Sequence, residues 1–74
     1  MELPTPEEVK SAREKIQESL GLGITEAQKW CADLIYKGLR TWQQWENGDR
    51  RMDPAFWELF NIKADLEEFN NDPK

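Results

Sequence analysis

The chain contains no histidine and only one cysteine, Cys31. A single cysteine cannot close an internal disulfide, and without histidine the chain lacks the ligand spacing of zinc fingers and the base of nucleophilic triads. It also lacks a phosphate-binding loop, because Gly21 and Gly23 are not followed by the Lys-Ser/Thr of such loops. Carboxylates are plentiful, but they fall on the expected solvent faces of helices. The sequence therefore argues against an enzyme, and it indicates no cofactor, no metal and no small-molecule ligand.

Long apolar runs are missing as well. Charged residues make up 34% of the chain and its mean hydropathy is -0.89, and no stretch approaches the roughly 20 apolar residues that span a bilayer. The first ten residues, MELPTPEEVK, begin acidic and lack the apolar segment of a signal peptide. We therefore expect a cytoplasmic protein with no membrane partner.

A chain of 74 residues is expected to form one domain that spans residues 1–74. A domain near this size buries only about 60% of its unfolded surface. Its core must therefore be rich in aromatic residues or be supported by a partner, and four Trp and three Phe supply large apolar area.

The net charge of -5 is unevenly distributed along the chain. Residues 1–27 hold six acids and three bases, and residues 53–74 hold six acids and two. Residues 28–52 hold five bases and three acids and form the positive block, with a charge of +2. A folded chain of this kind can present a basic side and turn its acidic ends away.

Apolar spacing and capping residues predict an all-α fold. Thr5, Pro6 and Glu8 form a capping box at the start of a first helix, which runs to about residue 19 and is ended by Gly21 and Gly23. Its apolar stripe consists of Val9, Ala12, Ile16 and Leu20.

A second capping box, from Thr25 to Gln28, predicts a second helix that runs to about residue 35. After a break at residues 36–38, Gly38 caps a third helix over residues 39–47. A fourth helix begins after Asp53, a short helix is expected near residues 64–69, and residues 70–74 are expected to be a flexible polar tail.

The segment from Gln28 to Gly48, QKWCADLIYKGLRTWQQWENG, places Ala32 in the second helix and the pair Trp42 and Trp45 in the third. This segment resembles the helix-turn-helix of the lambda-repressor-like, Cro/CI-type regulators of phages and bacteria. The run LRTWQQWENG carries most of the likeness, and DRRMDP followed by FWELF is similar to the loop and fourth helix of the family. The chain departs from the family at Tyr36, where glycine is frequent, and this departure concerns the geometry of the turn.

The resemblance covers roughly residues 5–63 and implies a compact, four- to five-helix DNA-binding domain, with the helix-turn-helix at about residues 26–47. It implies a sequence-specific regulator of transcription, of the small phage or prophage repressor type, that binds double-stranded DNA as a homodimer in the bacterial cytosol or nucleoid. The third helix would then enter the major groove. The implied base contacts are Leu39, Arg40, Gln43 and Gln44, and the implied contacts to the DNA backbone are Gln28, Lys37, Thr41, Asn47, Arg50 and Arg51.

Several of these residues also have a plainer interpretation. Arg40 and Gln44 lie four residues apart on one face, which is equally the pattern of a solvated polar face. Gln28 either helps the start of the second helix to hold a phosphate or only completes a capping box. Arg51 either contacts DNA or pairs with a nearby carboxylate.

The aromatic residues leave alternatives open too. Trp42 and Trp45 are expected in the core, with base stacking as the weaker alternative. Trp30 either packs on the first helix or marks a partner surface, and part of the set Phe56, Trp57 and Phe60 is a candidate dimer contact. A second hypothesis for the whole chain is a helical protein-interaction module, such as an inhibitor, adaptor or antitoxin-like protein, that keeps this scaffold without binding DNA.

Overall fold

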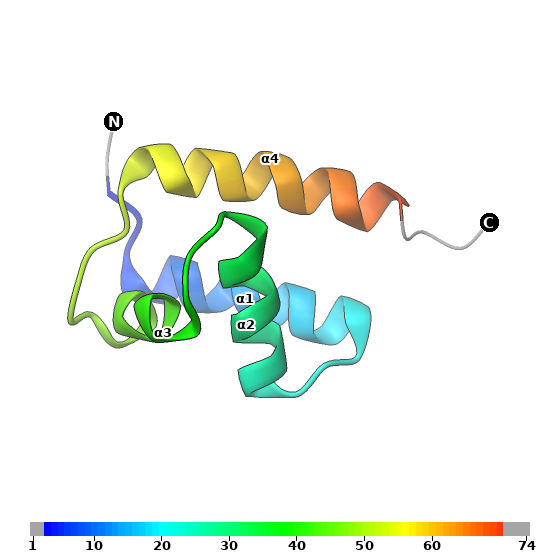
Figure 1. Cartoon of the computed structure of the whole chain (residues 1–74), viewed down its shortest axis with the longest axis horizontal. Coiled ribbons are helices and arrows are strands. Elements are labelled where there is room, and N and C mark those ends of the chain that lie inside the picture. Colours follow the sequence, from blue (N-terminus) through cyan, green and yellow to red (C-terminus); the bar gives the residue numbers. More distant parts are fainter. Residues whose placement is uncertain (1–2, 71–74) are drawn as a thin grey trace.

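The computed structural model describes residues 3–70, with side chains as far as residue 66. These residues form four α-helices and the segments that join them (Figure 1). The helices are α1 (Pro6–Leu20), α2 (Ile24–Leu34), α3 (Leu39–Asn47) and α4 (Pro54–Asn70). No strand occurs within these residues. The radius of gyration, 11.7 Å, is close to the roughly 11 Å expected for a compact chain of this length. The all-α prediction is confirmed at this level.

The ends of α1 follow from local chemistry, as the sequence predicts. The Oγ1 atom of Thr5 accepts a hydrogen bond from the N–H of Glu8 at 3.1 Å, and the Glu8 carboxylate accepts one from the N–H of Thr5 at 3.0 Å. This reciprocal pair satisfies two backbone donors that a helix start leaves free. At the other end Gly21 has a φ of 67°, the left-handed conformation that closes helices.

The start of α2 corrects the sequence prediction. Gly23 does not end α1 but is the residue that precedes α2, and the helix begins at Ile24, before Thr25. The Glu26 carboxylate accepts a hydrogen bond from the N–H of Gly23 at 3.2 Å. The predicted capping box from Thr25 to Gln28 is therefore wrong. Gly23 is the residue before the helix, and Glu26, three residues later, supplies the carboxylate that accepts from its N–H.

The turn between α2 and α3 depends on a tyrosine in an unusual conformation. Tyr36 has a φ of 62°, which is costly for a residue with a Cβ atom. Its N–H donates to the carbonyl of Asp33 at 3.1 Å, and the N–H of Lys37 donates to that of Ala32 at 2.8 Å, so the last carbonyls of α2 are satisfied. The turn thus keeps the left-handed backbone conformation that glycine adopts easily. Gly38 precedes α3, as predicted.

A single long helix replaces the two predicted at the C-terminal end. Asp53 accepts a hydrogen bond from the N–H of Ala55 at 2.8 Å and so starts α4. The helix continues without a break to Asn70, so the predicted separate short helix near residues 64–69 belongs to α4. Of the predicted tail, Asn70 ends this helix and residues 71–74 lie outside the described residues.

The core lies where α2 meets its three neighbours. The small residues Ala27, Cys31 and Ala32 are fully buried on α2 and allow close approach, and α4 runs along one side of the other three helices (Figure 1). The Trp42 indole is fully buried, with its ring centroid 5.1 Å from that of Phe60 and 5.7 Å from that of Trp45. Within the described residues, no helix is both long and apolar enough to cross a membrane.

Candidate nucleic-acid interface

The helix α3 has one face anchored in the core and the other directed outward. Trp42 is fully buried and Trp45 is 6% exposed, whereas Arg40 and Asn47 are exposed and Gln44 is partly exposed. At 100° per residue, Arg40, Gln44 and Asn47 fall on the side opposite the two indoles. The prediction that both tryptophans belong to the core is confirmed, since their burial excludes a role in base stacking.

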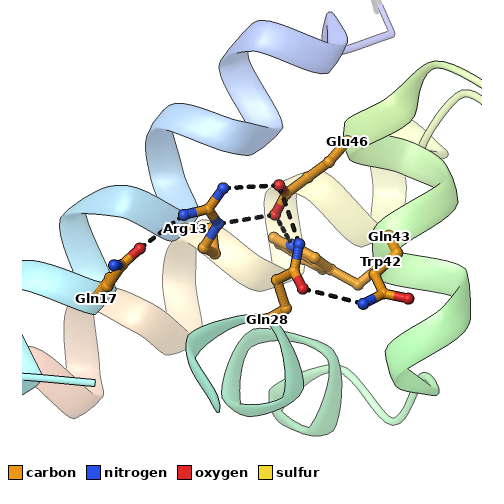
Figure 2. A network of polar contacts seen from close by, with 6 residues as sticks. All are labelled: Arg13, Gln17, Gln28, Trp42, Gln43 and Glu46. Atoms are coloured by element: carbon orange, nitrogen blue, oxygen red, sulfur yellow. Dashed lines mark hydrogen bonds and ion pairs between the residues drawn. The ribbon is translucent and has the colours of Figure 1, made fainter. Parts of the chain in front are cut away.

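A buried carboxylate fixes this helix to the other two. Glu46 of α3 accepts hydrogen bonds from the Nε and Nη2 atoms of Arg13 at 3.1 and 2.9 Å, from Trp42 Nε1 at 2.6 Å and from Gln28 Nε2 at 3.3 Å. Figure 2 shows these side chains converging from α1, α2 and α3, with Gln17 on the far side of Arg13. The network therefore determines how α3 is oriented on the rest of the domain.

The charges inside this network are compensated. The side chains of Arg13 and Glu46 are each 5% exposed, and the two oxygens of the carboxylate meet the guanidinium in a two-pronged ion pair. The hydrogen bond to Glu46 raises the pKa of Arg13 above its ordinary value, against the opposing effect of burial. Gln17 Oε1 accepts a further hydrogen bond from Arg13 Nη1 at 2.7 Å. All buried side-chain nitrogen and oxygen atoms among the described residues have a hydrogen-bond partner.

Gln28 connects the buried network to the outward face of α3. Its side chain is largely buried: the Nε2 atom donates to Glu46, and the Oε1 atom accepts a hydrogen bond from Gln43 Nε2 at 3.2 Å. Gln43 is partly exposed, so its amide group is held in a defined orientation at the edge of the outward face (Figure 2). The start of α2 already carries the carboxylate of Glu26 against the N–H of Gly23.

The remaining predicted contact residues surround α3 in different settings. Arg50 lies exposed in the loop after α3. Lys37 Nζ lies 4.3 Å from the centroid of the Phe56 ring. Leu39 and Thr41 are partly buried on either flank of α3.

Arg51 is committed to the N-terminal segment. Its guanidinium donates to the carbonyl of Pro4 at 3.2 and 3.1 Å and to that of Leu3 at 3.3 Å. These bonds hold the segment before α1 against the loop between α3 and α4. They replace the pairing with a nearby carboxylate that the sequence left open.

Arg13 and Glu46 are the two important residues that sequence reasoning missed. A signal was present, because Arg13 lies four residues after Val9 and three before Ile16 and thus interrupts the apolar stripe of α1. Glu46 lies four residues after Trp42, on the buried side of α3. Two opposite charges at core positions of separate helices indicate a buried ion pair.

Trp30 packs against the core cluster and is partly buried, as are Phe56 and Trp57. Of the two possibilities for Trp30, packing is therefore the one observed.

A search of protein-family models finds no match to the chain, and a search of curated proteins finds none either.

Proposed function

We propose that this protein is a sequence-specific regulator of transcription that binds double-stranded DNA, of the small phage or prophage repressor type. The observation that carries the proposal is the arrangement of α3: two buried indoles and a buried carboxylate anchor one side, and Arg40, Gln44 and Asn47 project from the other. A helix held in this way, with polar groups along its free face, suits the major groove, which admits one α-helix.

The outward side chains have the chemistry that distinguishes base pairs. An arginine guanidinium donates two hydrogen bonds to O6 and N7 of guanine, and a glutamine amide pairs with N6 and N7 of adenine. We assign these roles to Arg40 and Gln44, with Gln43 beside them in the orientation set by Gln28. To Leu39 we assign a contact with a thymine methyl group. Contacts to the DNA backbone are assigned to Lys37, Thr41, Asn47 and Arg50. Gln28 and Arg51, which the resemblance also implies, use their side chains within the domain: Gln28 on Glu46 and Gln43, and Arg51 on the carbonyls of Pro4 and Leu3.

Two copies are needed for adequate specificity, because one nine-residue helix reads few base pairs. A symmetric dimer would place its two reading helices in half-sites about one helical turn apart, roughly 34 Å. The positive block of residues 28–52 includes α3 and its flanks, and DNA phosphates attract positive charge. The acidic blocks before and after it limit non-specific binding.

The test begins by selecting bound duplexes from a random pool, which reports the preferred sequence, the half-site spacing and its symmetry. Gel-shift titration of the selected duplex then compares Arg40→Ala and Gln44→Ala with Lys10→Ala, an exposed residue of α1. Arg40→Ala is expected to cost about 1–3 kcal/mol and to relax preference at one position, and Lys10→Ala should have no effect. Unchanged binding by the variant that combines Arg40→Ala with Gln44→Ala would refute the assignment of α3.

A groove on the other side of the domain favours a second candidate function, a helical protein-interaction module. This groove, of about 380 Å³, lies between α1 and α4. Ile16, Trp57 and Phe60 contribute to its apolar floor, and Glu7 and Asp65 are among the acids at its edge. Salt titration separates the candidates, since binding to DNA weakens steeply as salt rises. Flat salt dependence, or no duplex binding at low salt, would favour the interaction module.

A further inference from the structure

The groove between α1 and α4 contains an aromatic side chain that the core only partly covers. The groove has a volume of about 380 Å³ and is open to solvent. Trp57 lines it and is stacked on the buried Phe60, with the ring centroids 6.0 Å apart and an interplanar angle of 14°. Trp57 itself is only partly buried. Tryptophans in such pockets are frequent anchors of protein interfaces.

One stripe of residues from each helix lines the groove. Ser11, Ala12 and Ala64 are small, so they leave room between the stripes for the side chains of a partner. Each stripe rises about 12 Å, or roughly two helical turns. In Figure 1, α1 and α4 both extend along the long axis of the molecule. The stripes consist of Glu7, Ser11 and Lys15 on α1, and of Trp57, Asn61 and Asp65 on α4.

The charges that line the groove are mainly acidic. Glu7, Glu8 and Asp65 are the acids, and Lys15 is the base among the described residues that line it. The Glu8 carboxylate is engaged in the capping box of α1. Glu7 and Asp65 are exposed, and neither carboxylate has a hydrogen-bond or ion-pair partner among the described residues. The groove therefore offers two carboxylates to a positively charged partner.

We propose that this groove binds a basic amphipathic helix of a partner protein, with apolar side chains beside Trp57 and Lys or Arg residues against Glu7 and Asp65. A helix fits because the groove between two helices accepts the side-chain ridge of a third. No strand occurs among the described residues, so they offer no sheet edge to an extended peptide. The partner is basic because its charges complement the two carboxylates.

The charge of the chain argues against a second copy as the occupant. The helices α1 and α4 lie in the acidic blocks, residues 1–27 with six acids and three bases and residues 53–74 with six acids and two. The positive block, residues 28–52, contains α3, whose apolar side is buried in its own core. A second copy would therefore place acidic residues against the acidic edge of the groove.

Partner binding in the groove goes beyond DNA binding and does not depend on it. None of the residues to which we assign DNA contacts lines the groove. A duplex on α3 and a helix between α1 and α4 therefore occupy different surfaces. For the second candidate function, the interaction module, the groove defines the chemistry of the partner.

Isothermal titration of the full chain with a synthetic peptide tests the proposal. The probe is an alanine-based helix of about 15 residues, with Leu along one side and Lys beside it. Two control peptides replace every Lys with Glu or every Leu with Gln. We expect the probe to bind with a dissociation constant on the order of 10–100 micromolar, because the interface is small. The controls should bind at least about tenfold more weakly. A probe that does not bind at about millimolar concentration, or an acidic control that binds equally well, would overturn the proposal.

A filled groove tests the importance of its shape. Ser11→Gln introduces a longer side chain at the centre of the groove, and the core is unchanged because Ser11 is exposed. This variant should bind the probe about tenfold more weakly. Ser19→Gln makes the same change at an exposed position of α1 outside the groove and should have no effect. Circular dichroism checks that both variants are folded, and equal affinities of the two would contradict the assigned surface.

A matched pair of double variants tests the charges. Glu7→Gln with Asp65→Asn removes the two carboxylates of the groove, and Glu14→Gln with Glu18→Gln removes two exposed carboxylates of α1 outside it. Both double variants change the net charge equally. The first should weaken binding of the probe about tenfold and the second by less than about twofold. Equal weakening would show that the overall charge attracts the probe, and the groove would lose its assignment.

Amide NMR signals of the isotopically labelled chain locate the bound probe. The signals of Ala12, Ala64 and the Trp57 indole should move during the titration, and that of Arg40 should stay in place. Largest changes on α3 would overturn the proposal. If the same signals move with protein concentration alone, a second copy occupies the groove and the proposed partner is wrong.

DNA binding and partner binding can fail separately. Arg40→Ala with Gln44→Ala should leave the affinity for the probe unchanged, and Ser11→Gln should leave the affinity for the selected duplex unchanged. A chain that binds the probe in the groove but binds no duplex retains the partner site and loses the proposed function. A chain that binds duplexes but not the probe retains the function and loses the partner site.

Discussion

Replacing Glu46 with glutamine, a side chain of the same shape, should strongly lower the free energy of unfolding of the domain. The carboxylate meets hydrogen-bond donors at all four of its contacts: Arg13 Nε and Nη2, Gln28 Nε2 and Trp42 Nε1. An amide of the same shape presents an N–H group to one set of these donors. It also removes the negative charge and leaves the Arg13 guanidinium buried without a counterion.

The magnitude follows from the burial of the pair. Both side chains are 5% exposed, and removing one partner of a buried pair costs about 3–5 kcal/mol. A domain of 74 residues has a total free energy of unfolding of about 4–11 kcal/mol. Glu46→Gln should therefore remove roughly half of it and bring the domain near the limit of folding at room temperature.

A matched control exists on the surface. The ion pair between Lys29 and Asp33 has almost the same separation, 3.0 Å against 2.9 Å, but its side chains are 65% and 61% exposed. Exposed pairs of this kind contribute about 0–1 kcal/mol. Asp33→Asn should therefore change the free energy of unfolding by less than about 0.5 kcal/mol, because water and salt screen the charges.

Urea unfolding followed by tryptophan emission measures both variants, with the slope against urea checked for constancy. Equal losses for Glu46→Gln and Asp33→Asn would refute the reasoning, because burial would then not determine the cost of a lost counterion. A variant that combines Arg13→Met with Glu46→Met adds a second check. It should be more stable than the sum of its single changes predicts, since it leaves no unpaired buried charge.

Two further predictions concern the turn and the cysteine. Tyr36→Gly should raise the free energy of unfolding by about 1 kcal/mol relative to Tyr36→Ala, because only glycine adopts a φ of 62° without strain; an alanine variant as stable as the glycine variant in urea titrations would contradict this. Burial raises the pKa of Cys31 from 9.0 to about 12. As the pH rises above about 9, the thiol therefore ionises in the unfolded chain before it does so in the folded one, and stability should fall by up to about 1.4 kcal/mol per pH unit from this group. Urea titrations between pH 8 and pH 11, on the order of one pH unit apart, should show that the free energy of unfolding falls more steeply with pH for the wild type than for Cys31→Ala. Parallel curves would exclude the effect.

The helices and their ends could be read from the sequence where neighbouring residues decide them. Thr5 and Glu8 form the predicted capping box, and α3 begins and ends at the predicted residues between Gly38 and Gly48. The start of α2 could not be read in the same way, because both Gly23 with Glu26 and Thr25 with Gln28 have the spacing of a capping pair. The core position of Gln28, where it meets Glu46 and Gln43, favours the first register.

Spacing along α3 likewise predicts which residues face outward. Trp42 and Trp45 are buried and Arg40 is exposed, as the alternation of apolar and polar residues indicates. The partners of the polar side chains depend on contacts between helices. The Arg13 ion pair joins residues 33 positions apart, and Arg51 meets the Pro4 carbonyl across 47 positions.

By itself the sequence determined the all-α class, most helix boundaries and the outward face of α3, because hydrogen bonding within a turn and the period of an α-helix are local properties. Only the tertiary structure decided that Glu46 gathers donors from three helices, that Gln28 orients Gln43, and that α4 is continuous and leaves Ile62 and Leu66 exposed. The reason is physical: a buried charge or an exposed leucine is defined by what packs against it, and that packing brings together residues that the chain keeps far apart.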